Sequence, residues 1–191
     1  MTFTLVIPLK GSPEPKSRFG GDLGFRRALA RAMALDTVEA ALEVAPVIAV
    51  TTEDLKLDVA KLGATVIADP GLGLNRAIEA GLVGVSTGST TGVLLGDLPG
   101  LDPLELGQAL NASVAPLSLV ADADGSGTVL VVAGPGIQHR LAFGPGSRAA
   151  HLANGYVELL DPWPTLRRDI DRAEHLHGLT LGPRTAALLA R

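Results

Sequence analysis

The chain has 191 residues, of which 47% are hydrophobic and 19% are charged, and its formal net charge is −4. The composition excludes a disordered chain, and the length predicts one domain over residues 1–191. The absence of cysteine excludes a disulfide scaffold, a thiol nucleophile and a zinc–thiolate site. The negative net charge argues against a nucleic-acid partner. Without a long apolar run or a signal peptide, we expect no membrane association and a cytoplasmic location.

Segments typical of strands alternate with segments typical of helices along the chain. Apolar runs predict strands at 3–9, 47–51, 64–68, 93–95, 117–121 and 128–133. Helical spacing predicts helices at 23–44, 53–62, 75–83, 103–114 and 148–154. Asp102 fits the N-cap of the helix at 103–114, because Pro103 and Glu105 follow at the first and third helical positions. This alternation predicts an α/β fold with a mostly parallel central sheet flanked by helices.

Glycine, acidic and basic residues gather in the segments that follow the predicted strands. Ligands of open α/β sheets bind beyond the carboxyl ends of the strands, so these segments are where a site is expected. The segments concerned are 10–18, 69–75, 96–99 and 122–128. Their shared chemistry predicts a polar ligand at one edge of the sheet.

Three aspartates are candidate ligands for a divalent cation: Asp97 in GDLP, and Asp169 and Asp171 in RRDID. Magnesium is commonly held by one or two carboxylates together with substrate phosphates. Residues i and i+2 of an extended segment share a face, and two carboxylates there repel each other unless a cation lies between them. Two alternatives stay open. Asp97 also fits a turn or a helix cap, and Asp171 with Glu174 fits a capping box.

Two glycine-rich segments are candidate phosphate sites. Gly125 and Gly127 allow a ligand to approach the backbone next to Thr128, although the same residues fit the turn of a β-hairpin. The segment FGPGS leads into a helix with Ser147 at its start, which fits an anion site and equally a plain serine cap. His151, one turn further along, is compatible with a phosphate contact or with packing.

Positive charge gathers in the loop after the first predicted strand, where Lys10, Lys16 and Arg18 occur together in an acidic protein. Such a loop is suited to neutralising a polyphosphate, and the alternative is a set of solvated surface charges. The chain contains no G-x-x-x-x-G-K-[ST] and no G-x-S-x-G segment, which argues against a P-loop nucleoside triphosphatase and an α/β-hydrolase.

Taken in chain order, these segments resemble the guanylyltransferases of deazaflavin coenzyme F-420 biosynthesis. The resemblance extends from Val6 to about Leu176, and it is carried by VIPLK with KSR, DPGLGLN, LLGDLP, DADGSGT, FGPGS with a following histidine, and RRDID. Of these, LLGDLP alone is shared with many other nucleotidyltransferases. The resemblance implies a Rossmann-like nucleotidyltransferase fold of the nucleotide-diphospho-sugar transferase type.

The resemblance also implies a reaction. GMP would pass from GTP to the phosphate of phosphoenolpyruvate, giving enolpyruvyl-diphospho-5'-guanosine and pyrophosphate. The alternative acceptors are 2-phospho-L-lactate, 3-phospho-D-glycerate and another phosphorylated compound, and a GTP-binding domain without activity is a further alternative. The downstream transferase that consumes the product is an expected partner.

The same resemblance assigns roles to individual residues. Magnesium ligands would be Asp97, Asp169 and Asp171, and the catalytic residues would be Asp97 and Lys16. The phosphate of the acceptor would be bound by Thr128, Gly144, Ser147 and Lys16. The nucleotide would be bound by Lys10, Arg18, Gly73 and Asn75.

Overall fold

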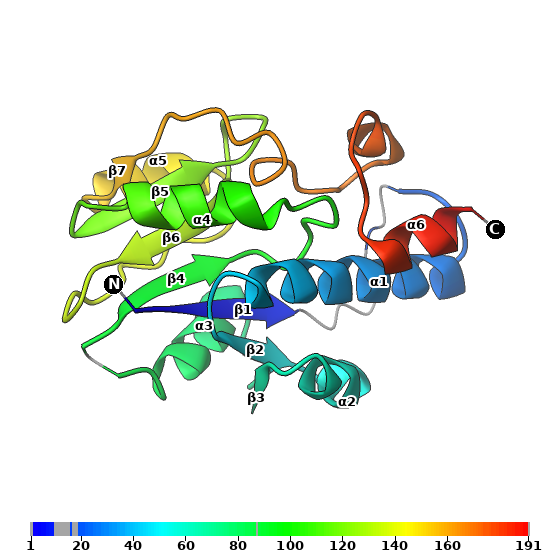
Figure 1. Ribbon diagram of the computed structural model, residues 1–191, viewed down its shortest axis with the longest axis horizontal. Coiled ribbons are helices and arrows are strands. Elements are labelled where there is room, and N and C mark those ends of the chain that lie inside the picture. The colour runs from blue at the N-terminus through cyan, green and yellow to red at the C-terminus, as the bar shows by residue number, and fades with distance from the viewer. Residues whose placement is uncertain (1, 10–15, 17–18, 87, 191) are drawn as a thin grey trace.

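The computed structural model describes residues 2–9, 16, 19–86 and 88–190. Its strands form one sheet in the order β3-β2-β1-β4-β6-β5-β7 (Figure 1). The strands are β1 Phe3–Leu9, β2 Val47–Thr51, β3 Thr65–Ala68, β4 Thr90–Leu94, β5 Leu117–Ala121, β6 Thr128–Ala133 and β7 Val157–Glu158. Strand β6 runs antiparallel to both of its neighbours, and the other pairings are parallel. The prediction of a mostly parallel α/β sheet is therefore confirmed.

Helices cover both faces of the sheet. They are α1 Leu23–Leu42, α2 Glu53–Lys61, α3 Leu74–Leu82, α4 Pro103–Ala112, α5 Ser147–Ala153 and α6 Pro183–Leu189, with a 3-10 helix at Ala173–Leu176. Helices α1, α2 and α4 contribute to the apolar core on one face, and α3 contributes to the core on the other. Among the described residues, no helix has both the length and the apolar character needed to cross a bilayer.

Most residues of strand β1 are buried, on both faces of the sheet, as expected for a central strand. Leu5, Ile7 and Leu9 belong to the core on the α1 side, whereas Val6 belongs to the core on the α3 side. Because both faces are covered, the strand is apolar at every one of these positions instead of alternating with polar residues.

Most predicted elements lie within one to three residues of the observed ones. Strand β4 begins at Thr90 instead of residue 93, because residues 90–92 continue the pairing with β1. Asp102 caps α4, since its carboxylate accepts a hydrogen bond from the Leu104 N–H. The prediction did not include β7, α6 or the 3-10 helix, which begins after Arg172 and leaves Asp171 outside its cap.

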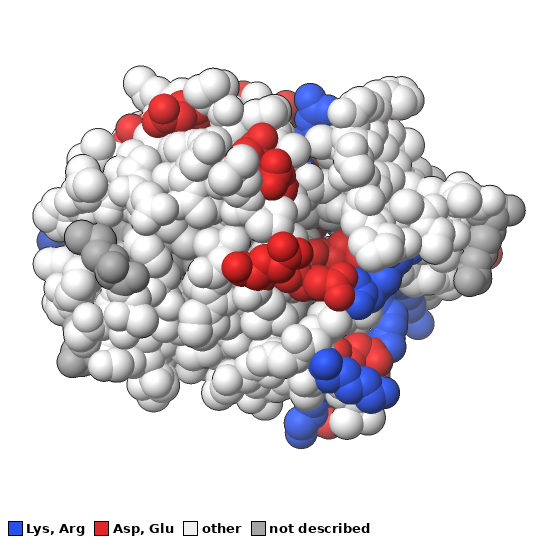
Figure 2. Space-filling view, viewed as in Figure 1, with Lys and Arg blue, Asp and Glu red and all other residues white. Residues whose placement is uncertain are grey.

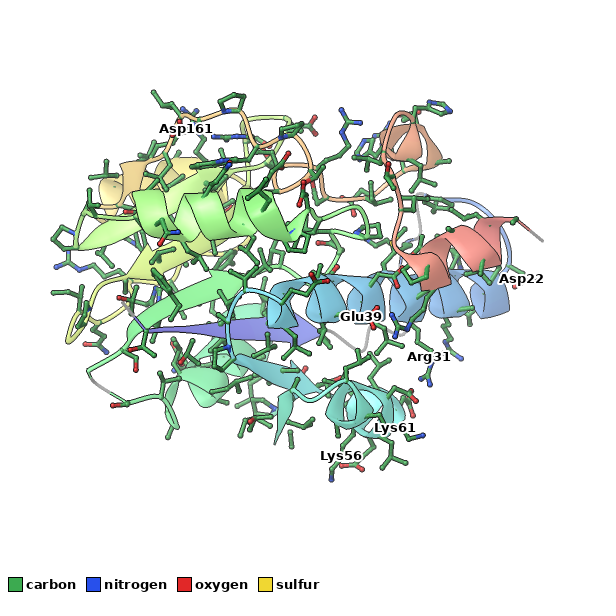
Figure 3. The ribbon with its side chains drawn as sticks, in the orientation of Figure 1. Asp22, Arg31, Glu39, Lys56, Lys61 and Asp161 are labelled. Atoms are coloured by element: carbon green, nitrogen blue, oxygen red, sulfur yellow. The ribbon has the colours of Figure 1, made fainter. Side chains whose placement is uncertain are left out.

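Charged side chains on the face shown in Figure 2 form acidic groups with basic groups beside them. Helix α1 forms ion pairs with two neighbouring helices, α2 and α6. Arg31 of α1 points toward α2 and pairs with Asp58 (Figure 3). Glu39 of α1 pairs with Arg184 of α6 at 2.6 Å.

Helix α6 is anchored to α1 by one buried carboxylate. The Asp36 side chain is 1% exposed and accepts hydrogen bonds from the backbone N–H groups of Arg184 and Thr185, at 3.2 and 2.8 Å. A Cβ on Gly182 would overlap the Asp36 side chain, so this close approach requires glycine. The Gly182 N–H also donates to the Pro99 carbonyl at 2.7 Å, which links the start of α6 to the GDLP segment.

We predict that Asp36→Ala lowers the free energy of unfolding by about 2–4 kcal/mol, because it leaves the backbone N–H groups of Arg184 and Thr185 without their acceptor and removes one of the two carboxylates that pair with the Arg184 guanidinium. Urea denaturation measures the loss. The control is Glu39→Ala, which removes the half-exposed carboxylate on the same arginine and should cost less than about 1 kcal/mol. Equal losses in the two variants would contradict the anchoring role of Asp36.

Candidate active site at the carboxyl edge of the sheet

The candidate site lies where several loops leave the same edge of the sheet. Strands β1, β4 and β5 run in the same direction, so the segments that follow β4 and β5 emerge together. Strand β6 runs the opposite way and therefore begins at this edge, with Thr128 as its first residue. The topology thus brings Asp97, the 122–127 loop and Thr128 to one edge.

Asp97, Asp169 and Asp171 converge at this edge. Each offers a carboxylate oxygen, and the three oxygens lie within 4.8 Å of one another. The residue between the pair explains the geometry, because Ile170 is fully buried and packs with Leu29 and Met33 of α1. The Ile170 N–H also donates to the Asp97 carbonyl at 3.2 Å. The buried Ile170 side chain therefore holds the segment 169–171 in a position where its two carboxylates lie close to Asp97.

The electrostatics of this carboxylate cluster favour a cation. Burial, together with the neighbouring charges of Asp97 and Asp171, raises the pKa of Asp169 to about 6. Among the described residues, the buried Asp97 Oδ1 has no hydrogen-bond partner. Carboxylate oxygens whose negative charge is not fully neutralised are the ligands that Mg²⁺ prefers. The residues present therefore fit a divalent cation, and their role as magnesium ligands remains a prediction.

Lys16 is the cation that the structure places at this cluster. Its Nζ lies 2.8 Å from Asp97 Oδ2 and 3.3 Å from Asp171 Oδ1. Burial alone would lower the pKa of the ammonium group, but the charges of Asp97 and Asp171 outweigh that effect and raise it. Lys16 also has a φ of 51°, a strained backbone conformation that is typical of functional sites. The predicted nucleotide contacts Lys10 and Arg18 lie outside the described residues.

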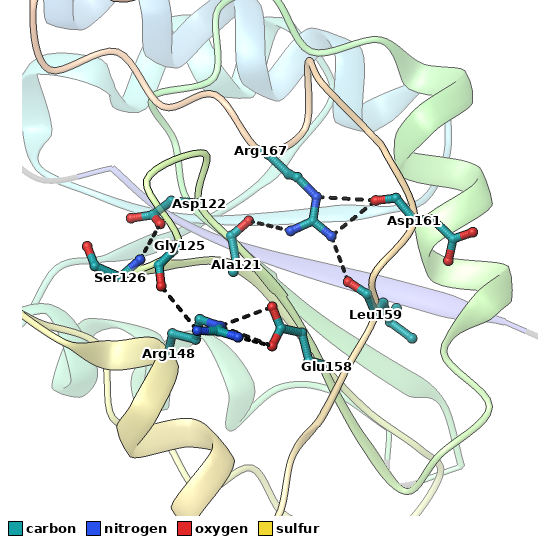
Figure 4. Close-up of polar contacts among 9 residues, drawn as sticks. All are labelled: Ala121, Asp122, Gly125, Ser126, Arg148, Glu158, Leu159, Asp161 and Arg167. Carbon is teal, nitrogen blue, oxygen red and sulfur yellow. Dashed lines mark hydrogen bonds and ion pairs between the residues drawn. The ribbon is translucent and has the colours of Figure 1, made fainter.

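The loop between β5 and β6 is shaped by Asp122. Its carboxylate accepts a hydrogen bond from the Ser126 N–H at 2.9 Å (Figure 4). It also accepts one from the Gly127 N–H at 2.8 Å. A Cβ on Gly127 would overlap this carboxylate, so the turn requires glycine at that position. The segment is thus a hairpin connection, as the alternative interpretation held, and it also ends on the predicted phosphate ligand Thr128.

Gly144 and Ser147 lie beside the 122–127 loop. The Ser147 N–H donates to the Gly144 carbonyl at 3.1 Å, and the Arg148 N–H donates to the Ser126 carbonyl at 3.3 Å. Arg148 forms an ion pair with Glu158 at 2.8 Å and also donates to the Gly125 carbonyl (Figure 4). The two glycine-rich segments that sequence analysis treated separately are therefore joined into one surface.

His151 lies behind this surface and does not line it. It is fully buried, so it is not positioned to contact a phosphate directly. Its Nδ1 lies 3.0 Å from Thr128 Oγ1, and its Nε2 accepts a hydrogen bond from the Ala142 N–H at 3.0 Å. Burial lowers the pKa of His151 to about 4. The packing interpretation of this histidine is correct, and its contact with Thr128 was not anticipated.

Asn75 connects the DPGLGLN segment to the FGPGS segment. Its side-chain amide donates to the Phe143 carbonyl and accepts from the Phe143 N–H, both at 3.0 Å. Gly73, with a φ of 93°, precedes α3 in a conformation that favours glycine. Asn75 thus bridges the DPGLGLN and FGPGS segments. The contacts of Asn75 and Gly73 with a nucleotide remain predictions.

Arg167 is a supporting residue that sequence analysis missed. Its guanidinium donates to the carbonyls of Ala121, Leu159 and Asp161, at 3.1, 2.6 and 3.1 Å (Figure 4). The Arg167 carbonyl accepts from the Ala123 N–H at 2.8 Å. Arg167 therefore fixes the segment that leads into Asp169 against the end of β5. The sequence signal was limited to the position of this arginine two residues before an aspartate.

We predict that Asp169→Asn makes the protein more stable when divalent cations are removed with EDTA. The change relieves the repulsion among partly buried carboxylates, which is worth about 1–2 kcal/mol. Urea denaturation of both proteins measures the gain, and adding Mn²⁺ should stabilise the wild type more than the variant. Asp161→Asn, an exposed change, is the control and should have little effect. A loss of stability in Asp169→Asn would contradict this account of the cluster.

Comparison with known proteins supports a common origin with one family. Residues 3–158 match the family model described as "Guanylyl transferase CofC like". A phosphoenolpyruvate guanylyltransferase of Thermomonospora curvata is 44% identical, and the match covers 100% of this chain and 90% of the relative. The protein of the same name from Streptomyces coelicolor is 43% identical over 100% of this chain and 97% of its own.

Solved structures show the same fold. A protein of Desulfovibrio desulfuricans G20 that carries the name of a nucleotide-diphospho-sugar transferase aligns with a TM-score of 0.69 and 16% identity. The alignment covers 99% of this chain and 94% of that protein. At this level of identity the likeness shows the fold, whereas the sequence matches show the family. The chain belongs to the family of CofC-like guanylyl transferases.

Proposed function

We propose that this protein transfers GMP from GTP to the phosphate of phosphoenolpyruvate, giving enolpyruvyl-diphospho-5'-guanosine and pyrophosphate for coenzyme F-420 biosynthesis. The observation that carries the proposal is the convergence of three carboxylates and Lys16 at the carboxyl edge of the sheet. The names of the full-length relatives supply the acceptor and the guanylyl group.

The proposed reaction needs no general base. An oxygen of the acceptor phosphate attacks the α-phosphorus of GTP, a new P–O bond forms, and the bond to the β-phosphate oxygen breaks with release of pyrophosphate. The attacking oxygen is already ionised at neutral pH, so no general base is required. The protein must mainly align the two phosphates and offset their negative charge.

The carboxylate cluster and Lys16 provide the charge balance. Asp97, Asp169 and Asp171 would hold Mg²⁺, which supplies Lewis-acid stabilisation of phosphate charge when bound. The Lys16 ammonium, 2.8 Å from Asp97, keeps a fixed positive charge at the same place. Lys16 and Asp97 would be the catalytic residues, because they would help to offset the negative charge of the reacting phosphates. The contact of Lys16 with the acceptor would depend on its release from one of the two aspartates.

The other loops at this edge would bind the two substrates, some contacting the acceptor and others the nucleotide. Thr128 and Ser147 are nearly buried and Gly144 is exposed where the 122–127 loop meets the FGPGS segment, and these three residues would bind the acceptor phosphate. The nucleotide would lie against Lys10, Arg18, Gly73 and Asn75. The enol phosphoanhydride product is reactive, so direct transfer to the downstream transferase is expected. We place the reaction in the cytoplasm.

The proposal is tested by pyrophosphate release from GTP with Mg²⁺ and phosphoenolpyruvate. Separate reactions use 2-phospho-L-lactate or 3-phospho-D-glycerate as acceptor, and a matched set uses ATP, CTP or UTP as donor. We expect release with GTP and phosphoenolpyruvate. Asp169→Ala should reduce kcat at least about 100-fold with the fold retained, because it removes charge stabilisation of the transition state.

The control variant is Asp161→Asn, which removes an exposed carboxylate from a loop and should keep wild-type turnover. Circular dichroism of each variant checks the fold. Pyrophosphate release with a different acceptor would identify that compound as the substrate in place of phosphoenolpyruvate. Absence of pyrophosphate release by the wild type with every acceptor would refute the proposed reaction. Near-normal turnover by Asp169→Ala would refute the role of the carboxylate cluster.

A further inference from the structure

A buried histidine stands behind the proposed phosphate ligand Thr128. Thr128 is 2% exposed and His151 is fully buried, and their side chains meet at 3.0 Å through Oγ1 and Nδ1. The imidazole is held by edge contacts with Phe143 and Tyr156, at ring-centroid distances of 4.9 and 5.1 Å. This packing leaves the ring little freedom to turn.

The contacts of the ring determine where its proton lies. The Ala142 N–H can only donate, so the Nε2 that it meets at 3.0 Å must be the unprotonated acceptor. Burial lowers the pKa of His151 to about 4, so the ring is neutral at pH 7 and carries one proton. That proton is on Nδ1, and the Nδ1–H donates to Thr128 Oγ1.

The direction of this hydrogen bond has a consequence for Thr128. A hydroxyl group donates one hydrogen bond and accepts up to two. If the hydroxyl donated to His151, its proton would be used inside the protein. Because it accepts from His151 instead, its proton is available for another acceptor. Phosphate oxygens accept hydrogen bonds, so a hydroxyl fixed as a donor suits a phosphate site.

We propose that His151 is a positioning residue that fixes the Thr128 hydroxyl as a hydrogen-bond donor to the phosphate of the acceptor substrate. The identity of the ligand rests on the proposed function, whereas the orientation of the hydroxyl follows from the contacts of the ring. His151 itself does not touch the substrate.

Two substitutions separate the two contacts of the ring. In His151→Asn, the side-chain amide nitrogen is attached to Cγ, as Nδ1 is, so it can still donate to Thr128 while the partner of Ala142 is lost. In His151→Gln, the amide reaches the position of Nε2, so it can accept from Ala142 while the donor to Thr128 is lost. His139→Gln, at a partly buried histidine that contacts Thr91 and the Tyr156 hydroxyl but not Thr128, is the control for loss of an imidazole ring.

Isothermal titration measures phosphoenolpyruvate binding in the presence of Mg²⁺ and α,β-methylene-GTP, which does not transfer its guanylyl group. We expect His151→Gln to weaken phosphoenolpyruvate binding about tenfold or more, which is typical of a lost hydrogen bond to a charged group. His151→Asn and His139→Gln should stay within about threefold of the wild type, and the affinity for the nucleotide should not change in any variant. In a Thr128→Val background, His151→Gln should have no further effect on phosphoenolpyruvate binding, because the hydroxyl through which it acts is gone.

A second measurement does not depend on substrate. Long-range ¹H–¹⁵N spectra of the full-length protein at neutral pH should show the His151 proton on Nδ1 alone. A proton on Nε2, or on both nitrogens, would overturn the inference. So would wild-type affinity for phosphoenolpyruvate in His151→Gln, or an undiminished effect of His151→Gln in the Thr128→Val background.

The outcomes also distinguish this inference from the proposed function. Phosphoenolpyruvate binding without pyrophosphate release from GTP would refute the proposed reaction and leave the role of His151 standing. Failure of the wild type to bind phosphoenolpyruvate would overturn the phosphate role of Thr128 and His151 as well.

Discussion

Repulsion among three converging carboxylates is the constraint around which this protein is organised. Asp97, Asp169 and Asp171 bring their oxygens within 4.8 Å of one another, and within the described part of the chain Lys16 pairs with only two of them, Asp97 and Asp171. The fold must therefore hold this arrangement by other contacts. Ile170 does so from inside the core, and its N–H bonds to the Asp97 carbonyl. The anchoring of α6 through Gly182 secures the GDLP segment from the other side.

The second half of the site is built from hydrogen bonds between loops. Asp122 shapes the connection between β5 and β6, and Arg148 joins that connection to the start of α5. Asn75 ties α3 to Phe143, and His151 holds Thr128 from behind. The polar groups that support the loops thus form hydrogen bonds with one another and hold the proposed phosphate ligands where the two segments meet. A positioned, mostly preformed site of this kind suits a reaction that depends on alignment and charge.

Much of the fold could be predicted from the sequence because its causes are local. Apolar runs such as 3–9 and 128–133 define strands buried on both faces, and the Asp102–Pro103 pair marks the start of α4. The rule for strand ends indicated a site near Asp97, whereas the grouping of Asp97 with Asp169 and Asp171 was implied by the family resemblance. Other features depend on contacts between distant residues. The bond from Thr185 to Asp36 spans 149 positions, and the burial of His151 is set by Phe143 and Tyr156. No local pattern indicates either contact.

The central claim is that the carboxylate cluster is a cation site used with a nucleotide. The most direct measurement is an anomalous difference map from crystals of the protein grown with Mn²⁺ and α,β-methylene-GTP, recorded near the manganese absorption edge. The account predicts a peak bounded by the carboxylates of Asp97, Asp169 and Asp171, next to the phosphates of the nucleotide. Manganese held elsewhere, or nucleotide bound at this edge with no peak among the three aspartates, would contradict it.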